Sequence, residues 1–157
     1  MSLACFLRTS SRTASFAWLF FLFLLPDAAY SATGYDIFLT NRMEDGKPAE
    51  ERISRFDCSD RIYVVVIAAG LGEGEHELKV RWLDPTGEQR ELTRFDFQGA
   101  RIANHVWAWL QLHGPTGAII GQMFDPSFGM EEFIGDWNAV VFINNKKVST
   151  QKFQVLC

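Results

Sequence analysis

Hydrophobic and polar residues alternate along much of the chain, which is the pattern of half-buried β-strands. The alternation is clearest over 75–83, where every second residue is bulky and the residues between are charged. Four residues of this stretch are expected to face inward: His76, Leu78, Val80 and Trp82. Residues 61–69 differ, because after Arg61 they are apolar on both faces. That composition indicates a central strand that is covered on both sides.

The final stretch, 135–157, predicts a closing β-hairpin. Its first strand places four apolar residues on one face: Trp137, Ala139, Val141 and Ile143. The turn falls at Asn144 and Asn145, since asparagine tolerates the positive φ that a two-residue hairpin turn requires. Val148 is out of phase with the rest of the return strand, so a bulge is expected near 149–151.

Further strands are expected over 35–40, 53–58, 88–97 and 103–112, with a charged surface loop at 41–52 and a turn at 84–87. Residues 114–134 show no clear period and are expected to form a long loop. No helical period follows residue 31. The pattern therefore predicts an all-β domain, an antiparallel β-sandwich of about seven strands.

Residues 1–31 have the pattern of an export signal. Arg8 and Arg12 precede an apolar run over 16–25, which is too short for a membrane-spanning helix. The small residues before Ala32 predict cleavage at that point, which would leave one domain, 32–157, without a stable membrane anchor. An uncleaved signal anchor is the alternative. The prediction is a periplasmic or secreted protein.

Charge and cysteine content narrow the classes of function. The formal net charge of −4 becomes −5 after cleavage, because two arginines and one aspartate leave. An acidic domain without a basic stripe is a poor nucleic-acid binder, so no nucleic-acid partner is expected. The cleaved chain keeps Cys58 and Cys157, which predict one disulfide in an oxidising compartment, with two free thiols as the alternative. Closing a loop of about 100 residues would stabilise the fold by roughly 4.7 kcal/mol.

The stretch 105–113 contains the most informative candidate site. Alternation puts Trp107 and Trp109 on one face of the strand, and only one face of a sandwich strand normally enters the core. An exposed tryptophan stripe suits a protein partner or stacking on sugar rings. The predicted binding residues are Tyr63, Trp107, Trp109, Met123 and Phe128.

The alternative is that the loop 114–134 folds back over the stripe. Four of its apolar residues would then form the cover: Met123, Phe124, Phe128 and Phe133. In that case the tryptophans belong to the interior, and the binding surface lies elsewhere.

No pattern of catalytic, metal-binding or cofactor-binding residues stands out. His105 and His113 share a face but are roughly 26 Å apart at ~3.3 Å per residue, too far for one ion. Four acidic residues near the long loop match no ion-binding spacing: Asp125, Glu131, Glu132 and Asp136. Ser127 lacks the flanking glycines of a nucleophile elbow. We therefore predict no catalytic residue, no metal site and no cofactor.

Three motifs carry a resemblance to known proteins. They are Phe-Asp-Cys-Ser-Asp-Arg-Ile-Tyr at 56–63, Trp-Leu-Asp-Pro-Thr-Gly at 82–87, and Gly-x-Trp at 135–137 with a hairpin ending in Phe-x-Val-x-Cys. Together they resemble exported bacterial immunoglobulin-like domains of unknown function. The resemblance implies an immunoglobulin-like sandwich in the cell envelope and carries over no catalytic residue.

These observations predict an exported, non-catalytic β-sandwich that binds another envelope or extracellular protein. A carbohydrate-binding module that uses the tryptophan stripe, with a glycan as its ligand, is the alternative.

Overall fold

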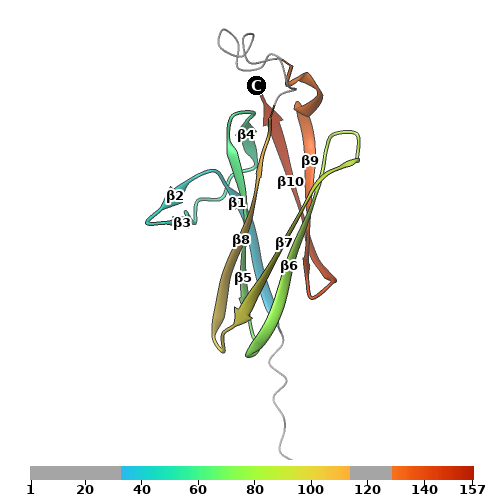
Figure 1. The fold of residues 1–157 in the computed structure, drawn as a ribbon. Helices are drawn as coiled ribbons and strands as arrows, with labels where there is room; N and C mark the ends of the chain where they lie inside the picture. The colour runs from blue at the N-terminus through green and yellow to red at the C-terminus, as the bar shows by residue number, and fades with distance from the viewer. Residues whose placement is uncertain (1–32, 114–128) are drawn as a thin grey trace, which may run out of the picture. The chain divides into compact units, whose positions relative to one another are not determined.

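The computed structural model describes residues 33–113 and 129–157, and nearly all of the regular structure there is β-strand (Figure 1). The all-β class predicted from the sequence is confirmed. The elements are β1 (Gly34–Thr40), β2 (Met43–Glu44), β3 (Lys47–Pro48), β4 (Arg55–Asp57), β5 (Arg61–Ala69), β6 (Gly74–Leu83), β7 (Gln89–Gly99), β8 (Ala103–Gln111), the 3-10 turn η1 (Glu131–Phe133), β9 (Gly135–Ile143) and β10 (Lys146–Leu156). The predicted signal sequence, with its cleavage point, lies outside the described residues.

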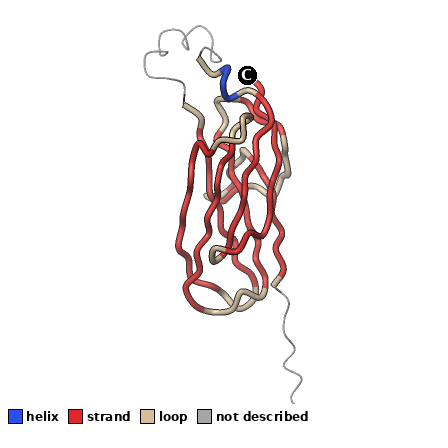
Figure 2. Tube along the Cα trace, turned by 90° about the vertical axis from the view of Figure 1, so that its right-hand side faces the viewer, coloured by secondary structure: helices blue, strands red, loops and turns tan. Residues whose placement is uncertain are grey.

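Two main sheets enclose the core. One is three-stranded, in the order β1-β5-β8, and the other is five-stranded, in the order β4-β10-β9-β6-β7. Figure 2 shows the long strands that make up these sheets. One prediction needs correction: β4 pairs with β10 in parallel, so the second sheet is mixed rather than wholly antiparallel. Alternation predicts which face a strand buries, but it carries no information on strand direction.

The inner faces of both sheets meet in one hydrophobic core. Trp82 of β6 and Trp137 of β9 are fully buried, and the Trp137 ring stacks on Phe153 of β10 with centroids 6.0 Å apart. Each indole nitrogen has a partner: Trp82 Nε1 donates to Thr93 Oγ1 at 3.1 Å, and Trp137 Nε1 donates to the Phe133 carbonyl at 2.7 Å. Large aromatic side chains therefore fill the core without an unpaired polar group.

The closing hairpin forms as the sequence predicts. Asn144 and Asn145 make the turn between β9 and β10 with φ of 50° and 64°. The register shifts between Lys147 and Ser149, which places the bulge at Val148, next to the predicted position. The out-of-phase valine is accommodated by this extra residue, so that Phe153 returns to the core face.

The segment 41–52 is more ordered than a surface loop. It contains the short hairpin β2–β3, whose turn uses Asp45 and Gly46 with φ of 50° and 77°. The Asp-Gly pair is the signal for this turn. Ala49, which follows the hairpin, is buried, and its backbone N–H donates to the Arg42 carbonyl at 2.9 Å.

The turn between β6 and β7 is organised by Asp84, whose side chain is fully buried. Its carboxylate accepts hydrogen bonds from the backbone N–H groups of Thr86 and Glu88, both at 2.9 Å, and from Arg90 Nε at 2.6 Å. Burial alone would raise the pKa of Asp84, but the hydrogen bonds from Thr86, Arg90 and Glu88 outweigh it and lower the pKa to about 2. The ionised carboxylate thus holds the turn.

Cys58 and Cys157 are joined by a disulfide with a Cα–Cα distance of 5.3 Å. The bond ties the residue after β4 to the residue after β10, beside the parallel pairing of these two strands. Among the described residues, no helix is long and apolar enough to cross a membrane.

Candidate functional site: the surface along strand β8

Strand β8 separates two different surfaces. Val106, Ala108 and Leu110 are buried on its inner face. On the outer face Trp107 is partly buried, whereas Trp109 is 50% exposed. The two tryptophans share a face, as the sequence indicates, but they do not share an environment.

Trp107 packs against a small cluster on the outer face of the three-stranded sheet. The buried members of this cluster are Phe38, Tyr63 and Val65. Val65 lies directly opposite Trp107, and Tyr63 lies opposite Trp109. Tyr63 is only 6% exposed, so this predicted binding residue supports the tryptophans from below and offers little surface to a partner.

The described cover of this cluster comes from the segment 41–52. The Arg52 guanidinium lies 4.5 Å from the centre of the Phe38 ring, and Arg52 Nη1 also donates to Asp36 at 2.9 Å. Pro48, Phe38 and Trp107 are among the residues that line the remaining groove of about 190 Å³. This role of 41–52 was not predictable from its charged, loop-like sequence.

The predicted cover, 114–134, lies mostly outside the described residues, including Met123, Phe124 and Phe128. Of that set, Phe133 is described. It is buried against Trp137, with ring centroids 6.3 Å apart, and belongs to the main core. Phe133 therefore takes no part in covering the stripe.

Trp109 borders a second hollow, which we call the seam cleft. The cleft lies between β8, the last strand of one sheet, and β7, the last strand of the other. Figure 1 shows the course of these two strands. It has a volume of about 360 Å³ and is almost wholly apolar. Its lining consists of Phe95, His105, Val106, Trp107 and Trp109.

Phe95 is the residue of this site that sequence reasoning missed. It lies opposite the buried Leu78 and in phase with the buried Phe97, which marks it as an inward residue. Phe95 is nevertheless 51% exposed, because it stands at the edge where the two sheets separate. Periodicity identifies its face but cannot tell that the core ends beside it.

The edge presented by β8 has no acidic, lysine or arginine side chain. The nine residues Ala103–Gln111 contain no Lys, Arg, Asp or Glu. The other edge strands do carry charges, such as Asp36 on β1, Arg55 on β4 and Arg94 on β7. Charged residues are a usual protection of exposed sheet edges, and β8 lacks it.

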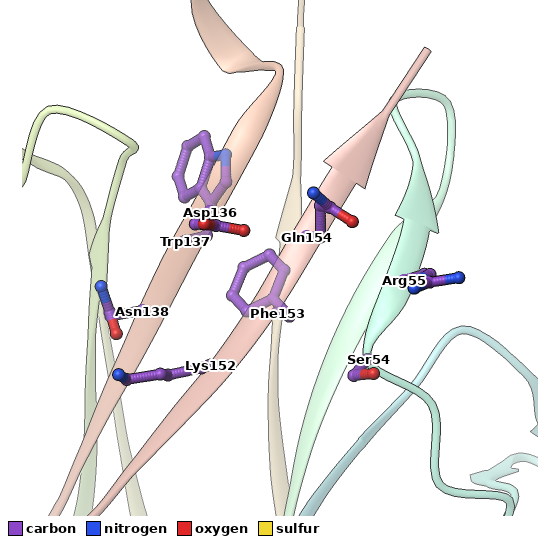
Figure 3. A pocket seen from close by; sticks show the side chains of 8 residues that line it. All are labelled: Ser54, Arg55, Asp136, Trp137, Asn138, Lys152, Phe153 and Gln154. Atoms are coloured by element: carbon purple, nitrogen blue, oxygen red, sulfur yellow. The ribbon is translucent and has the colours of Figure 1, made fainter.

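A polar hollow lies on the five-stranded sheet (Figure 3). Arg55, Asp136, Asn138 and Lys152 come to it from β4, β9 and β10, and its volume is about 380 Å³. Its open form and mixed charges suit water and small polar solutes without selecting one.

Within the described ranges, no group of three or more His, Cys, Asp or Glu residues is placed to hold a metal ion. His76 contacts the side-chain amide of Asn144 at 2.9 Å, and Glu132 pairs with Arg90 at 3.1 Å. Asp125 and Ser127 lie outside the described residues.

Comparisons with known proteins assign no family. No family model matches the chain, and no curated protein sequence matches it. Solved structures with a similar arrangement include the alkylpurine DNA glycosylase AlkC from Pseudomonas fluorescens bound to DNA containing an abasic site analog, with 11% identity and a TM-score of 0.47. The match covers 80% of this chain and 30% of that one.

The β-glucosidase from Listeria innocua, in complex with glucose, is another similar structure, with 12% identity and a TM-score of 0.43 over 79% of this chain. The chain spans about a third or less of each of these larger proteins, 30% and 16% of their lengths.

Proposed function

We propose that this protein is an exported, immunoglobulin-like β-sandwich without catalytic activity, and that it binds another envelope or extracellular protein through the seam cleft. One observation supports this proposal above the others. Trp109 and Phe95 are each about half exposed, and they line the same apolar hollow between two sheet edges.

Covering the exposed aromatic rings of this site would supply part of the free energy of specific binding. A Trp or Phe side chain buries roughly 150–250 Å², so covering the exposed halves removes on the order of 200 Å² from water. At about 25 cal/mol per Å² this area gives a gross gain of roughly 5 kcal/mol before the costs of association. Two rigid aromatic rings in a hollow are typical of the residues that dominate protein–protein affinity.

Two features support export. Residues 1–31 carry the charged, apolar and small-residue segments of a signal sequence. The disulfide between Cys58 and Cys157 is a bond that persists in oxidising compartments such as the periplasm or the extracellular space. The proposed function therefore includes a periplasmic or secreted location for the protein.

A carbohydrate is the second candidate ligand. Trp109 presents a flat ring on the outer face, and the neighbouring Gln111 side chain is held by Arg61 Nη2 at 3.0 Å. A ring beside fixed polar groups is the arrangement that stacks on and hydrogen-bonds a sugar. The cleft itself is almost wholly apolar, which favours the protein partner.

The test compares the wild-type domain 32–157 with Trp109→Ala and Leu156→Ala, each immobilised and exposed to envelope extract of the cells that make it. Leu156 is the matched control, because it is 44% exposed on β10 and does not line the cleft. We expect the wild-type domain to capture one protein in a stoichiometric amount. This protein should be absent from the Trp109→Ala sample and present in the Leu156→Ala sample. Equal capture by both variants contradicts the proposal. A glycan array that responds to Trp109→Ala, without a protein partner, establishes the carbohydrate alternative.

A further inference from the structure

We propose that the occupant of the seam cleft is an extended peptide segment of the partner protein, which adds to the free edge of β8 as a further strand of the sheet β1-β5-β8. This inference rests on the proposed function for its biological meaning. Its physical basis, however, is independent and consists of the edge, the exposed inner residue Phe95 and the absence of charge.

The backbone of β8 is paired along one edge only in the described part of the chain. This strand pairs with β5 on one side, and in the described part of the chain no strand pairs with its other side. A nine-residue edge of this kind presents a row of N–H and C=O groups over about 30 Å. The partner that satisfies such a row is an extended chain, because alternate backbone groups then meet in register.

Phe95 is an inward residue that the core leaves half exposed. Its ring belongs to the inner face, since it lies opposite Leu78, which is 1% exposed, yet half of Phe95 remains in contact with water. The two sheets therefore enclose a core that is incomplete at this margin. A strand added to β8 would send every second side chain inward, over Phe95. One apolar residue of the segment would complete the core there.

A second copy of the protein fits this edge less well. Two β8 strands paired edge to edge would continue the sheet, but each would keep its inner residues in its own core. Val106, Ala108 and Leu110 are already 7%, 1% and 2% exposed. None of them is free to cover Phe95 of the other copy. The inward side chains of a single extended segment are not buried in a core of their own, so one of them can cover Phe95.

The charges near the cleft describe the segment further. β8 has no Lys, Arg, Asp or Glu, while β7 carries Arg90, Glu91, Arg94 and Asp96. A strand that enters the seam therefore meets a neutral edge on the β8 side and a charged one on the β7 side. An uncharged segment of alternating apolar and small polar residues matches the β8 edge and leaves the charges of β7 in water.

The probe for this proposal is a short synthetic peptide of alternating valine and threonine, and its control is the same peptide with an N-methyl group on every backbone amide. Methylation of every amide removes all backbone donors and blocks both edges of the peptide, while its side chains stay the same. We expect the methylated peptide to bind the full mature domain about tenfold more weakly or worse, because ladder hydrogen bonds are lost. Calorimetry measures both affinities.

Two further readouts locate the binding. Saturation with the unmethylated peptide should slow hydrogen exchange by about tenfold or more at those β8 amides that point away from β5. Trp109→Lys and Phe95→Lys should each lower the affinity for the peptide at least about tenfold, while Leu156→Lys should leave this affinity unchanged. Circular dichroism and the thermal midpoint show whether each variant is folded, and both aromatic positions are exposed enough to accept lysine.

Three results would overturn the inference. Equal affinity for both peptides shows that no ladder forms. If the β8 amides that point away from β5 already exchange slowly in the free monomer, the edge is occupied by the protein's own chain. Protection that rises with protein concentration, together with a dimer in sedimentation, identifies a second copy as the occupant.

The two proposals fail in different ways. If the peptide binds as described but no envelope protein depends on Trp109, the strand-accepting edge stands and the proposed function falls. If an envelope protein depends on Trp109 but methylation of the peptide has no effect, the function stands and the strand-addition mode falls.

Discussion

Replacing Asp84 by asparagine tests how strongly the β6–β7 turn is held by charge. The side chain keeps its shape, but the negative charge opposite Arg90 is lost. Arg90 also donates to Glu132 at 3.1 Å and lies 5.6 Å from the centre of the Phe133 ring. The pair Asp84–Arg90 therefore joins the turn to η1 at the end of the core, and its loss should be felt beyond the turn.

The magnitude follows from the pKa of Asp84. It is about 2 in the folded protein and 3.8 in an exposed aspartate. At 1.36 kcal/mol per pKa unit this difference corresponds to at most about 2.4 kcal/mol. Arg90 is 36% exposed, so solvent screens part of the ion pair, and we expect about 1–2 kcal/mol.

The sign is that of a lowered carboxylate pKa. The stabilisation is present in full above pH 3.8 and is lost as the pH falls through about 2. Urea unfolding at a series of pH values measures it. At pH 7, Asp84→Asn should lower the free energy of unfolding by about 1–2 kcal/mol. This difference should stay constant down to about pH 4 and then shrink towards pH 2.

The matched control is Asp96→Asn, an exposed carboxylate on β7, which should change the free energy by less than about 0.5 kcal/mol. A difference for Asp84→Asn that stays constant between pH 7 and pH 2 would refute the reasoning. In that case the loss would come from altered turn geometry and not from the charge.

Three further predictions concern stability. Cys157→Ser should lower the free energy of unfolding by roughly 2–5 kcal/mol relative to wild type in oxidising buffer, and Cys58→Ser, which breaks the same bond, is measured beside it. Reductant should abolish the difference between Cys157→Ser and wild type. Gly99→Ala should cost about 1–3 kcal/mol, because the added Cβ would lie 2.2 Å from the Gly72 carbonyl oxygen; unchanged stability would show that the backbone moves freely there. Asn145→Gly should raise the thermal midpoint slightly, since φ is 64° in the hairpin turn, whereas Leu156→Gly should not.

Much of the fold could be predicted from the sequence, because residue alternation determines which face of a strand is buried and turn residues determine where a hairpin reverses. Alternation identified the buried face of β6 and β9, and the Asn144–Asn145 pair identified the turn. The parallel pairing of β4 with β10 was beyond prediction, since strand direction depends on how the whole chain is routed. The hairpin β2–β3 was missed although Asp45-Gly46 is a turn signal, because the flanking strands have two residues each.

The candidate site was predicted in part. The sequence separated Trp107 and Trp109 from the inner face of β8. It could not rank them, because the partial burial of Trp107 depends on Phe38 and Val65 from other strands. For the same reason the sequence pointed to Tyr63 as a binding residue and did not point to Phe95. Tyr63 is covered by distant residues, whereas Phe95 stands where the core ends. The exposed fraction of a side chain depends on residues that pack on it from other strands. The alternation of residues within one strand does not record those contacts.

The central claim, that the seam cleft is a protein-binding site, is tested most directly by photo-crosslinking in the cells that make the protein. A photoreactive amino acid replaces His105, which lines the cleft, in one strain and Leu156 in another, and mass spectrometry identifies the adducts. The account predicts one dominant protein adduct from position 105, absent from position 156 and lost when Trp109→Ala is added. Equal adducts from both positions, or none from position 105, would contradict it.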